Sequence, residues 1–301
     1  MYPYKMKENI KAVGFGEVLI DNFPTQSKIG GAPLNVSGRL QAFGVDVSLI
    51  SSVGDDSQGK KIKSYLKNIG LDLSGIQVNK NYPTGEVNVI LNDKGVASYD
   101  ISYPVAWDKI QLAKLDIARV QKSDVFLFGS LVCRDKVSQN TLKELLKHAT
   151  YKVFDVNLRV PHYTKELLLE LMKEADFIKF NDDELYEIAG YLGCKYLSME
   201  QIIVFIAKAT NTKTVCVTKG AFGAVLFKDG KFYYNSGFRI KVLDTVGSGD
   251  SFLASIIYKL FNDEEPQEAI DFGCAVGAMV ACSKGANPIL TKQKIAKFMN
   301  P

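Results

Sequence analysis

The sequence predicts an α/β fold in which a doubly wound, mostly parallel sheet carries a small β-sheet lid. Short β-branched runs alternate with amphipathic helical patterns along most of the chain, as expected for parallel strands with helices on both faces. Several of these runs are apolar throughout, which is typical of strands that are covered on both sides. The length of 301 residues suits one α/β domain with an insertion, so we expect residues 1–301 to form a single domain.

The strand runs and the helical patterns follow one another in chain order. The expected strands are Ala12–Phe15, Val47–Val53, Val125–Phe128, Val153–Val156, Phe177–Phe180, Val215–Thr218 and Ala224–Phe227. The expected helices between them include Gln58–Asn68, Ser138–His148, Thr164–Glu174 and Met199–Ala209.

Two segments interrupt this rhythm. Gly85–Tyr103 alternates apolar and polar residues and contains the turn Asn92-Asp93-Lys94-Gly95, which predicts a β-hairpin instead of a strand–helix unit. Ile20–Ile29 is irregular. We expect residues 20–29 and 85–103 to form the lid; a surface hairpin without a function is the alternative interpretation.

Composition excludes several classes of function. The net charge is only +4 and no Lys/Arg block stands out, so nucleic acid is not an expected partner. No apolar run is long enough to span a membrane, and the N-terminus has no signal-like apolar region. Five cysteines without a paired spacing indicate reduced thiols, so we expect a cytoplasmic protein. The two histidines, His148 and His162, leave little for a zinc site or a Ser/His/Asp triad.

The most informative segment is Asp244–Phe252, which ends in an apolar helical pattern. Gly247, Ser248 and Gly249 supply a small, flexible backbone just before a helix, where free N–H groups and the helix dipole favour an anion. Asp250 lies beside that anion hole, where a carboxylate is useful if it takes a proton from the group that attacks a bound phosphate. The alternative interpretation is an ordinary acidic residue in a first helical turn.

Two further glycine-containing segments lead to different interpretations. Gly30-Gly31-Ala32-Pro33-Leu34-Asn35 allows close backbone approach to a ligand, and the Asn35 amide suits vicinal hydroxyls. Gly54–Lys61 nearly fits a P-loop, but Lys61 replaces the Ser or Thr that binds Mg²⁺, and Asp55 and Asp56 would repel phosphates. We interpret it as a solvated loop that opens a helix at Gln58.

Together these segments resemble the signatures of the ribokinase-like (PfkB-type) carbohydrate kinases. The N-terminal signature is similar to Gly30–Val36 followed by the Val53–Asp56 turn, and the C-terminal one to Asp244–Phe252. Their order and separation also fit, so the resemblance covers essentially the whole chain. It implies a ribokinase-like fold with ATP, Mg²⁺ and K⁺ as cofactors.

The resemblance also implies roles for matching residues. Asp250 would be the catalytic base, with Gly247, Ser248 and Gly249 as the anion hole. The implied sugar-binding residues are Asp21, Gly31, Asn35, Arg159 and Asp250. The implied ATP-binding residues are Asn181, Thr218, Lys219, Gly220, Gly247, Gly249, Gly277 and Ala278. Glu184 would hold Mg²⁺ through water, and Asp244 and Val246 would supply oxygens to a monovalent cation.

The chain departs from the family pattern at Cys274, where relatives often carry an Asn near the adenine. Four segments look closest to those of fructokinases, namely Gly16-Glu17, Asp21–Pro24, Gly30–Val36 and Asp155–Arg159. We therefore expect an ATP-dependent kinase that phosphorylates a primary hydroxyl of a free hexose, with D-fructose as the expected sugar, and a homodimer formed through the lid. The alternatives are a kinase for 2-keto-3-deoxygluconate, ribose or a nucleoside, and a non-catalytic sugar- or nucleotide-binding protein.

Overall fold

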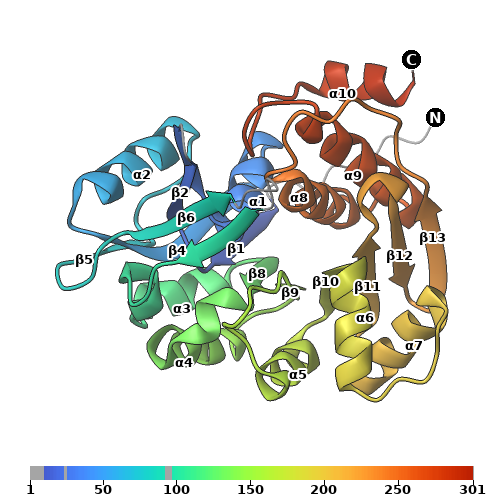
Figure 1. Cartoon of the computed structure of the whole chain (residues 1–301), viewed down its shortest axis with the longest axis horizontal. Helices are drawn as coiled ribbons and strands as arrows, with labels where there is room; N and C mark the ends of the chain where they lie inside the picture. Colours follow the sequence, from blue (N-terminus) through green and yellow to red (C-terminus); the bar gives the residue numbers. More distant parts are fainter. Residues whose placement is uncertain (1–9, 24–25, 92–96, 301) are drawn as a thin grey trace.

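The computed structural model describes residues 10–23, 26–91 and 97–300. Its main element is a nine-stranded sheet (Figure 1). In spatial order the strands are β13 (Lys231–Asn235), β12 (Ala224–Lys228), β11 (Thr214–Thr218), β10 (Phe177–Asn181), β9 (Lys152–Asp155), β8 (Val125–Gly129), β1 (Lys11–Phe15), β4 (Asp46–Gly54) and β5 (Ile76–Asn79). Neighbours are parallel except β12 and β13, which continue from β11 in antiparallel fashion. The predicted fold class is confirmed.

The strand order reverses at β1. The chain runs from β1 to β4 and β5 on one side, and then returns to place β8 on the other side of β1. In open parallel sheets, ligands bind in the crevice outside the carboxyl ends of the strands at such a reversal. Gly16, Asp155, Asn181 and Thr218 lie at the carboxyl ends of four of these strands.

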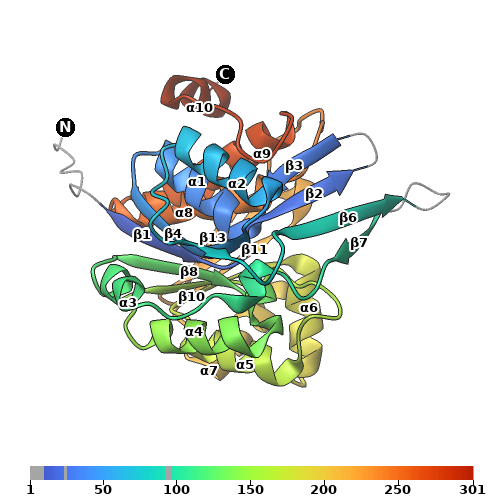
Figure 2. The same ribbon diagram turned by 90° about the vertical axis from the view of Figure 1, so that its left-hand side faces the viewer.

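Helices cover both faces of the sheet (Figure 2). One face carries α1 (Ala32–Ala42), α2 (Ser57–Asn68), α8 (Ser248–Phe261), α9 (Pro266–Ala281) and α10 (Lys292–Met299). The other carries α3 (Lys114–Gln121), α4 (Lys136–Leu146), α5 (Lys165–Glu174), α6 (Asp182–Tyr191) and α7 (Met199–Thr210). Short 3₁₀ turns form η1 (Ala106–Lys109), η2 (Leu131–Arg134) and η3 (Gly220–Phe222). None of the helices in the described part is long and apolar enough to cross a membrane.

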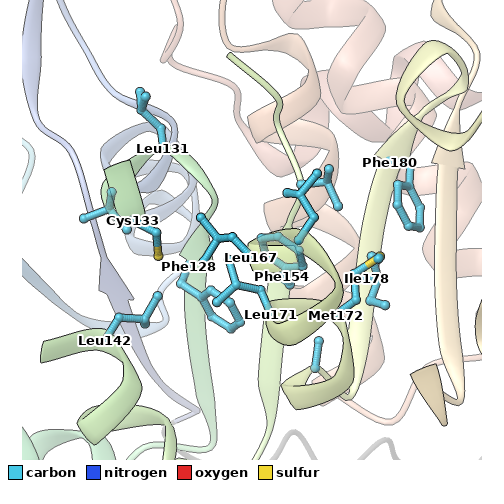
Figure 3. Packing of buried hydrophobic residues seen from close by; sticks show 14 of the residues in the cluster. Phe128, Leu131, Cys133, Leu142, Phe154, Leu167, Leu171, Met172, Ile178 and Phe180 are labelled. Atoms are coloured by element: carbon cyan, nitrogen blue, oxygen red, sulfur yellow. The ribbon is translucent and has the colours of Figure 1, made fainter. Parts of the chain in front are cut away.

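The hydrophobic core has two main layers, one on each side of the sheet. In one layer the rings of Phe128 and Phe154 stack with centroids 5.1 Å apart, and Leu167 and Leu171 of α5 pack against this layer (Figure 3). Because both faces of the central strands are buried, the strands need apolar side chains in both directions. This explains why the sequences of these strands do not alternate between apolar and polar residues.

A second, four-stranded sheet projects beside the main one, with the order β3-β2-β6-β7 (Figure 2). Its strands are β2 (Leu19–Phe23), β3 (Gln26–Gly30), β6 (Gly85–Leu91) and β7 (Ala97–Ile101). The antiparallel β6–β7 pair confirms the predicted hairpin, whose turn at 92–95 lies outside the described residues. The segment interpreted as irregular is a pair of antiparallel strands, β2 and β3, and β2 joins β6 in parallel.

The loop that resembles a P-loop is a capped helix start. Asp56 accepts a hydrogen bond from the Gly59 amide at 2.7 Å and two more from Thr84, from its amide at 2.8 Å and its hydroxyl at 2.7 Å. Helix α2 begins at Ser57, one residue before the predicted position. Since Asp56 caps the helix where a P-loop would bind phosphate, this loop contributes to structure and not to nucleotide binding.

Candidate active site

Helix α8 begins inside the predicted anion hole. Gly247 has φ 75°, and a Cβ there would lie 2.4 Å from the side chain of Ala286, so only glycine fits. The helix starts at Ser248, two residues earlier than if Gly247, Ser248 and Gly249 all belonged to the loop. The amides of Gly249 and Asp250 therefore belong to the first turn, which has no intrahelical acceptor for them. They are free to bind an anion.

A cavity of about 450 Å³ lies in front of this helix start. The structure brings together in its lining all five residues predicted to bind sugar, from β2, α1, the segment after β9 and α8, namely Asp21, Gly31, Asn35, Arg159 and Asp250. Gly247 and Val246 also line it. Carboxylate, amide and guanidinium groups around one cavity suit a ligand with many hydroxyls. We call this the polar cavity.

A second cavity of about 240 Å³ lies on the other side of the α8 start. Its lining includes Thr218, Gly220, Ser248, Gly249, Gly277 and Ala278, together with Phe238, Phe252 and Cys274. Of the residues predicted to bind ATP, five line this cavity and Gly247 lines the polar one. Lys219 and Asn181 line neither. Small residues beside apolar side chains suit a flat ring, and we call this the apolar cavity.

The two cavities meet at the α8 start. Thr245 and Gly249 line both of them, and Asp250 is the next residue on the polar side. A ligand in one cavity can therefore present a group to a ligand in the other beside the anion hole. This arrangement suits the transfer of a charged group between two bound molecules.

Asp250 is held in place by an amide. The Asn35 side chain donates to Asp250 Oδ2 at 2.8 Å, and Asn287 donates to Asn35 Oδ1 at 3.3 Å. Burial, followed by the charge of Asp155, raises the pKa of Asp250 to about 6, although Asn35 and Lys179 act in the opposite direction. A carboxyl with this pKa is ionised at neutral pH and still takes up a proton readily.

The backbone at the start of α1 approaches the backbone of Glu17 closely, because Gly31 has no side chain. Gly31 has φ 113°, and a Cβ would lie 2.3 Å from the carbonyl oxygen of Glu17. This contact places Asn35, in the first turn of α1, beside Asp250.

Sequence reasoning missed three ionisable residues around Asp250. Lys179 Nζ lies 3.1 Å from Asp155 Oδ1. Burial alone would lower the pKa of Lys179, but the charge of Asp155 and other carboxylates raises it, so this lysine stays protonated. Burial raises the pKa of Glu17 to about 7. Glu17 Oε2 and Asp155 Oδ2 have no hydrogen-bond partner among the described residues.

One signal for Lys179 was present in the sequence, because it interrupts the apolar run of β10. Asn157, which lines the polar cavity with φ 39°, adopts a left-handed conformation that is uncommon outside glycine. Such backbone strain often occurs at functional sites.

Glu184 and Asn181 form a capping box at the start of α6. Asn181 Oδ1 accepts from the Glu184 amide at 2.8 Å, and Glu184 Oε2 accepts from the Asn181 amide at 2.8 Å. Glu184 Oε1 accepts from the Leu158 amide at 2.9 Å. Both carboxylate oxygens thus already hold backbone amides. Among the described residues no group of three or more His, Cys, Asp or Glu side chains is placed to hold a metal ion.

Asp244, the expected ligand of a monovalent cation, is engaged by protein groups. Its Oδ1 accepts from the Val246 amide at 3.1 Å, and its Oδ2 accepts from the Gly285 amide at 3.2 Å. The Lys28 ammonium lies 2.6 Å from Oδ2. Burial opposes ionisation, but the hydrogen bond from Lys28 and the two amides lower the pKa of Asp244 below its usual value. Asp244 Oδ2 thus already holds the Lys28 ammonium and one amide, and Oδ1 holds one amide.

The model of the pfkB family of carbohydrate kinases matches residues 1–293. Fructokinase-2 of Solanum lycopersicum is 29% identical over 310 residues, which cover 92% of each chain.

Two solved structures are similar in fold. The fructokinase of Vibrio cholerae O395, in a fructose, ADP and calcium ion bound form, has a TM-score of 0.82 at 20% identity and covers 97% of this chain and 99% of its own. The aminoimidazole riboside kinase of Salmonella enterica, complexed with aminoimidazole riboside and an ATP analog, has a TM-score of 0.80 at 22% identity and covers 96% of this chain and 100% of its own.

Proposed function

Because the chain belongs to the pfkB family of carbohydrate kinases, we propose that it transfers the γ-phosphoryl group of ATP to the primary hydroxyl of a free hexose, D-fructose. The observation that carries the proposal is the meeting of the polar and apolar cavities beside Asp250 and the α8 start. The choice of fructose is supported by curated relatives of similar length that are fructokinases, such as that of Solanum lycopersicum.

In this proposal the sugar lies in the polar cavity, with Asp21, Asn35 and Arg159 bound to its hydroxyls. The attacking hydroxyl gives its proton to Asp250. Its oxygen forms a bond to the γ-phosphorus as the bond from that phosphorus to the β–γ bridging oxygen breaks, and ADP leaves with that oxygen. The amides of Gly249 and Asp250 stabilise the charge on the transferred group.

The nucleotide base and ribose lie in the apolar cavity, against Gly277, Ala278 and Cys274. The triphosphate extends toward Thr245 and Gly249, which line both cavities. Lys179 is a buried cation close to this path, since a Cβ at Gly249 would lie 3.7 Å from Nζ. We assign to Lys179 the role of balancing the negative charges of Asp155 and of the phosphates.

Mg²⁺ is expected to arrive with the nucleotide, because its usual ligands are phosphates, water and one or two carboxylates. The unpartnered oxygen of Asp155 fits a magnesium-bound water. Glu184 fits only an indirect role, since both its oxygens hold amides. When bound, the ion would neutralise charge on the phosphates.

The four-stranded sheet is proposed to be a lid. Leu19, Asp21 and Phe23 of β2, with Val87 and Ile101 across the sheet, line the polar cavity. An apolar and acidic cover over the sugar supports the exclusion of water, which would otherwise accept the phosphoryl group in place of the sugar.

The predicted homodimer through the lid remains a prediction. Asn22 donates to Glu86 at 2.9 Å, and Ser27 donates to Asn22 at 2.8 Å, on the lid face opposite the cavity. The described part of that face is thus largely polar, and a lid-to-lid interface there would rest on hydrogen bonds. Sedimentation at micromolar concentration decides between a dimer and a monomer.

A substrate panel tests the proposal. The protein is incubated with ATP and each of D-fructose, ribose, adenosine and 2-keto-3-deoxygluconate, and ADP release is followed. We expect fructose to give the highest kcat/KM. A value at least about tenfold higher for another member would replace fructose and leave the kinase function intact. No sugar-dependent ADP release with any member of a wider alcohol panel would contradict the kinase function itself.

A further inference from the structure

An ion pair connects the lid to the loop before α8, which we call the anion-hole loop. Lys28 lies on β3 of the lid, and Asp244 lies in the loop before α8, 216 residues away in sequence. The Lys28 ammonium and Asp244 Oδ2 are 2.6 Å apart, with side-chain exposures of 23% and 17%. This is a partly buried pair, so each charge depends on the other for compensation.

Lys28 lies beside two residues of β2 on the same lid face. Its cross-strand partner is Asp21, on the lid face that lines the polar cavity. The ammonium also lies 5.1 Å from the centre of the Phe23 ring, within range of a cation–π interaction. The lysine is therefore oriented toward Asp244 by its own lid strand.

Asp244 needs a positive partner because of where it lies. Its carboxylate accepts from the amides of Val246 and Gly285, and so orders the loop that leads into Gly247 and the α8 start. An uncompensated carboxylate beside a phosphate site would repel the phosphate, with a Coulomb energy that increases as water is excluded. A cation at Asp244 removes that repulsion.

We propose that the Lys28 ammonium is the cation of this site, so that the chain phosphorylates its substrate without a monovalent metal ion. The inference rests on the proposed kinase function. It replaces the expectation that Asp244 and Val246 bind K⁺, which the Lys28 contact does not fit. Because Lys28 is part of the lid, the charge of the anion-hole loop is balanced when the lid is in place, and Lys28 acts as a positioning residue.

The test compares cations of equal charge at equal ionic strength, which keeps screening constant. Sugar phosphorylation and the melting temperature are measured in potassium chloride and in choline chloride, whose cation is too large to replace K⁺. The variants are Lys28→Met, which keeps the apolar stem without the charge, and Lys28→Arg, which keeps the charge. Lys152→Met is the matched control, because Lys152 pairs with Glu174 at 3.0 Å at the opposite end of the sheet strands.

We expect wild-type kcat to differ by less than about twofold between the two salts, and Lys28→Met to lose about tenfold or more in choline and to recover part of it in potassium. Potassium should also raise the melting temperature of Lys28→Met, since a ligand that binds the folded state stabilises it. Lys28→Arg and Lys152→Met should resemble the wild type in their response to potassium.

Strong potassium activation of the wild type would overturn the inference, and so would a Lys28→Met variant that is active and indifferent to potassium. If Lys28→Met does not fold, the wild-type response alone decides. If the wild type phosphorylates no sugar, the proposed function fails, and the effect of potassium on the wild-type melting temperature still tests whether Lys28 occupies the cation site.

Discussion

At the scale of single residues, the site is a group of carboxyls whose environments differ. Asp250 and Glu17 both face the polar cavity, and burial raises both pKa values, to about 6 and about 7. Asp244 instead has a lowered pKa because Lys28 and two amides bind it. Neighbouring carboxyls with different pKa values are typical of sites that move protons.

The raised pKa of Glu17 leads to a prediction about stability. Its pKa rises from 4.5 in the unfolded chain to about 7 in the folded one, so the folded state binds the proton more tightly. Stability therefore falls as pH rises from the unfolded pKa through the folded pKa, by roughly 3 kcal/mol at most. Glu17→Gln cannot ionise and should escape this loss.

We expect Glu17→Gln and the wild type to have similar unfolding free energies at about pH 5, and the variant to be more stable at about pH 8. Urea unfolding at the two pH values measures this. Glu174→Gln, at a half-exposed carboxyl far from the cavity, is the control. A difference between Glu17→Gln and the wild type that does not change with pH would argue against a buried charge at Glu17.

At the scale of elements, the lid strands show why sequence pattern has limits. The alternation of apolar and polar residues is broken over residues 20–29. The breaks include Asp21 and Lys28, which lie on the lid face that lines the polar cavity. A strand that lines a polar site carries polar residues at positions where a regular alternation would have apolar ones. The alternation pattern therefore does not identify it as a strand.

The lid proposal predicts the effect of shortening the hairpin. Val87 and Ile101 are paired across β6 and β7, so residues 88–100 can be replaced by a short glycine turn between them. The main sheet should keep its fold, because β6 and β7 belong to the four-stranded sheet and not to the nine-stranded one. Sugar phosphorylation should be lost, while basal ATP hydrolysis stays the same or rises, because water reaches the anion hole.

Circular dichroism and ADP release with and without sugar measure both effects. The control is Asp229→Gly, in the turn between β12 and β13 at the edge of the main sheet. A shortened hairpin that still phosphorylates sugar at the wild-type rate would contradict the lid role.

At the scale of the whole molecule, features that depend on neighbouring residues could be predicted from the sequence. Features that depend on contacts between distant residues could not. The doubly wound sheet, the hairpin and the Asp244–Phe252 segment follow from short-range pattern, since strand runs and a glycine-rich helix start are local features. Lys179 and Glu17 could not be assigned, because their roles depend on which charges the fold places around them. Lys28 and Asp244 are 216 residues apart, and no local pattern pairs them.

The account depends centrally on Asp250 as the base in a phosphoryl transfer from ATP to a sugar. The most direct measurement follows ADP and sugar phosphate together, by phosphorus NMR of reactions with fructose, for the wild type and for Asp250→Asn. We predict equal amounts of the two products from the wild type, with the phosphate on a primary carbon. For Asp250→Asn we predict a kcat lower by at least ~10²-fold with nucleotide affinity retained. Near-wild-type turnover by Asp250→Asn would contradict the account.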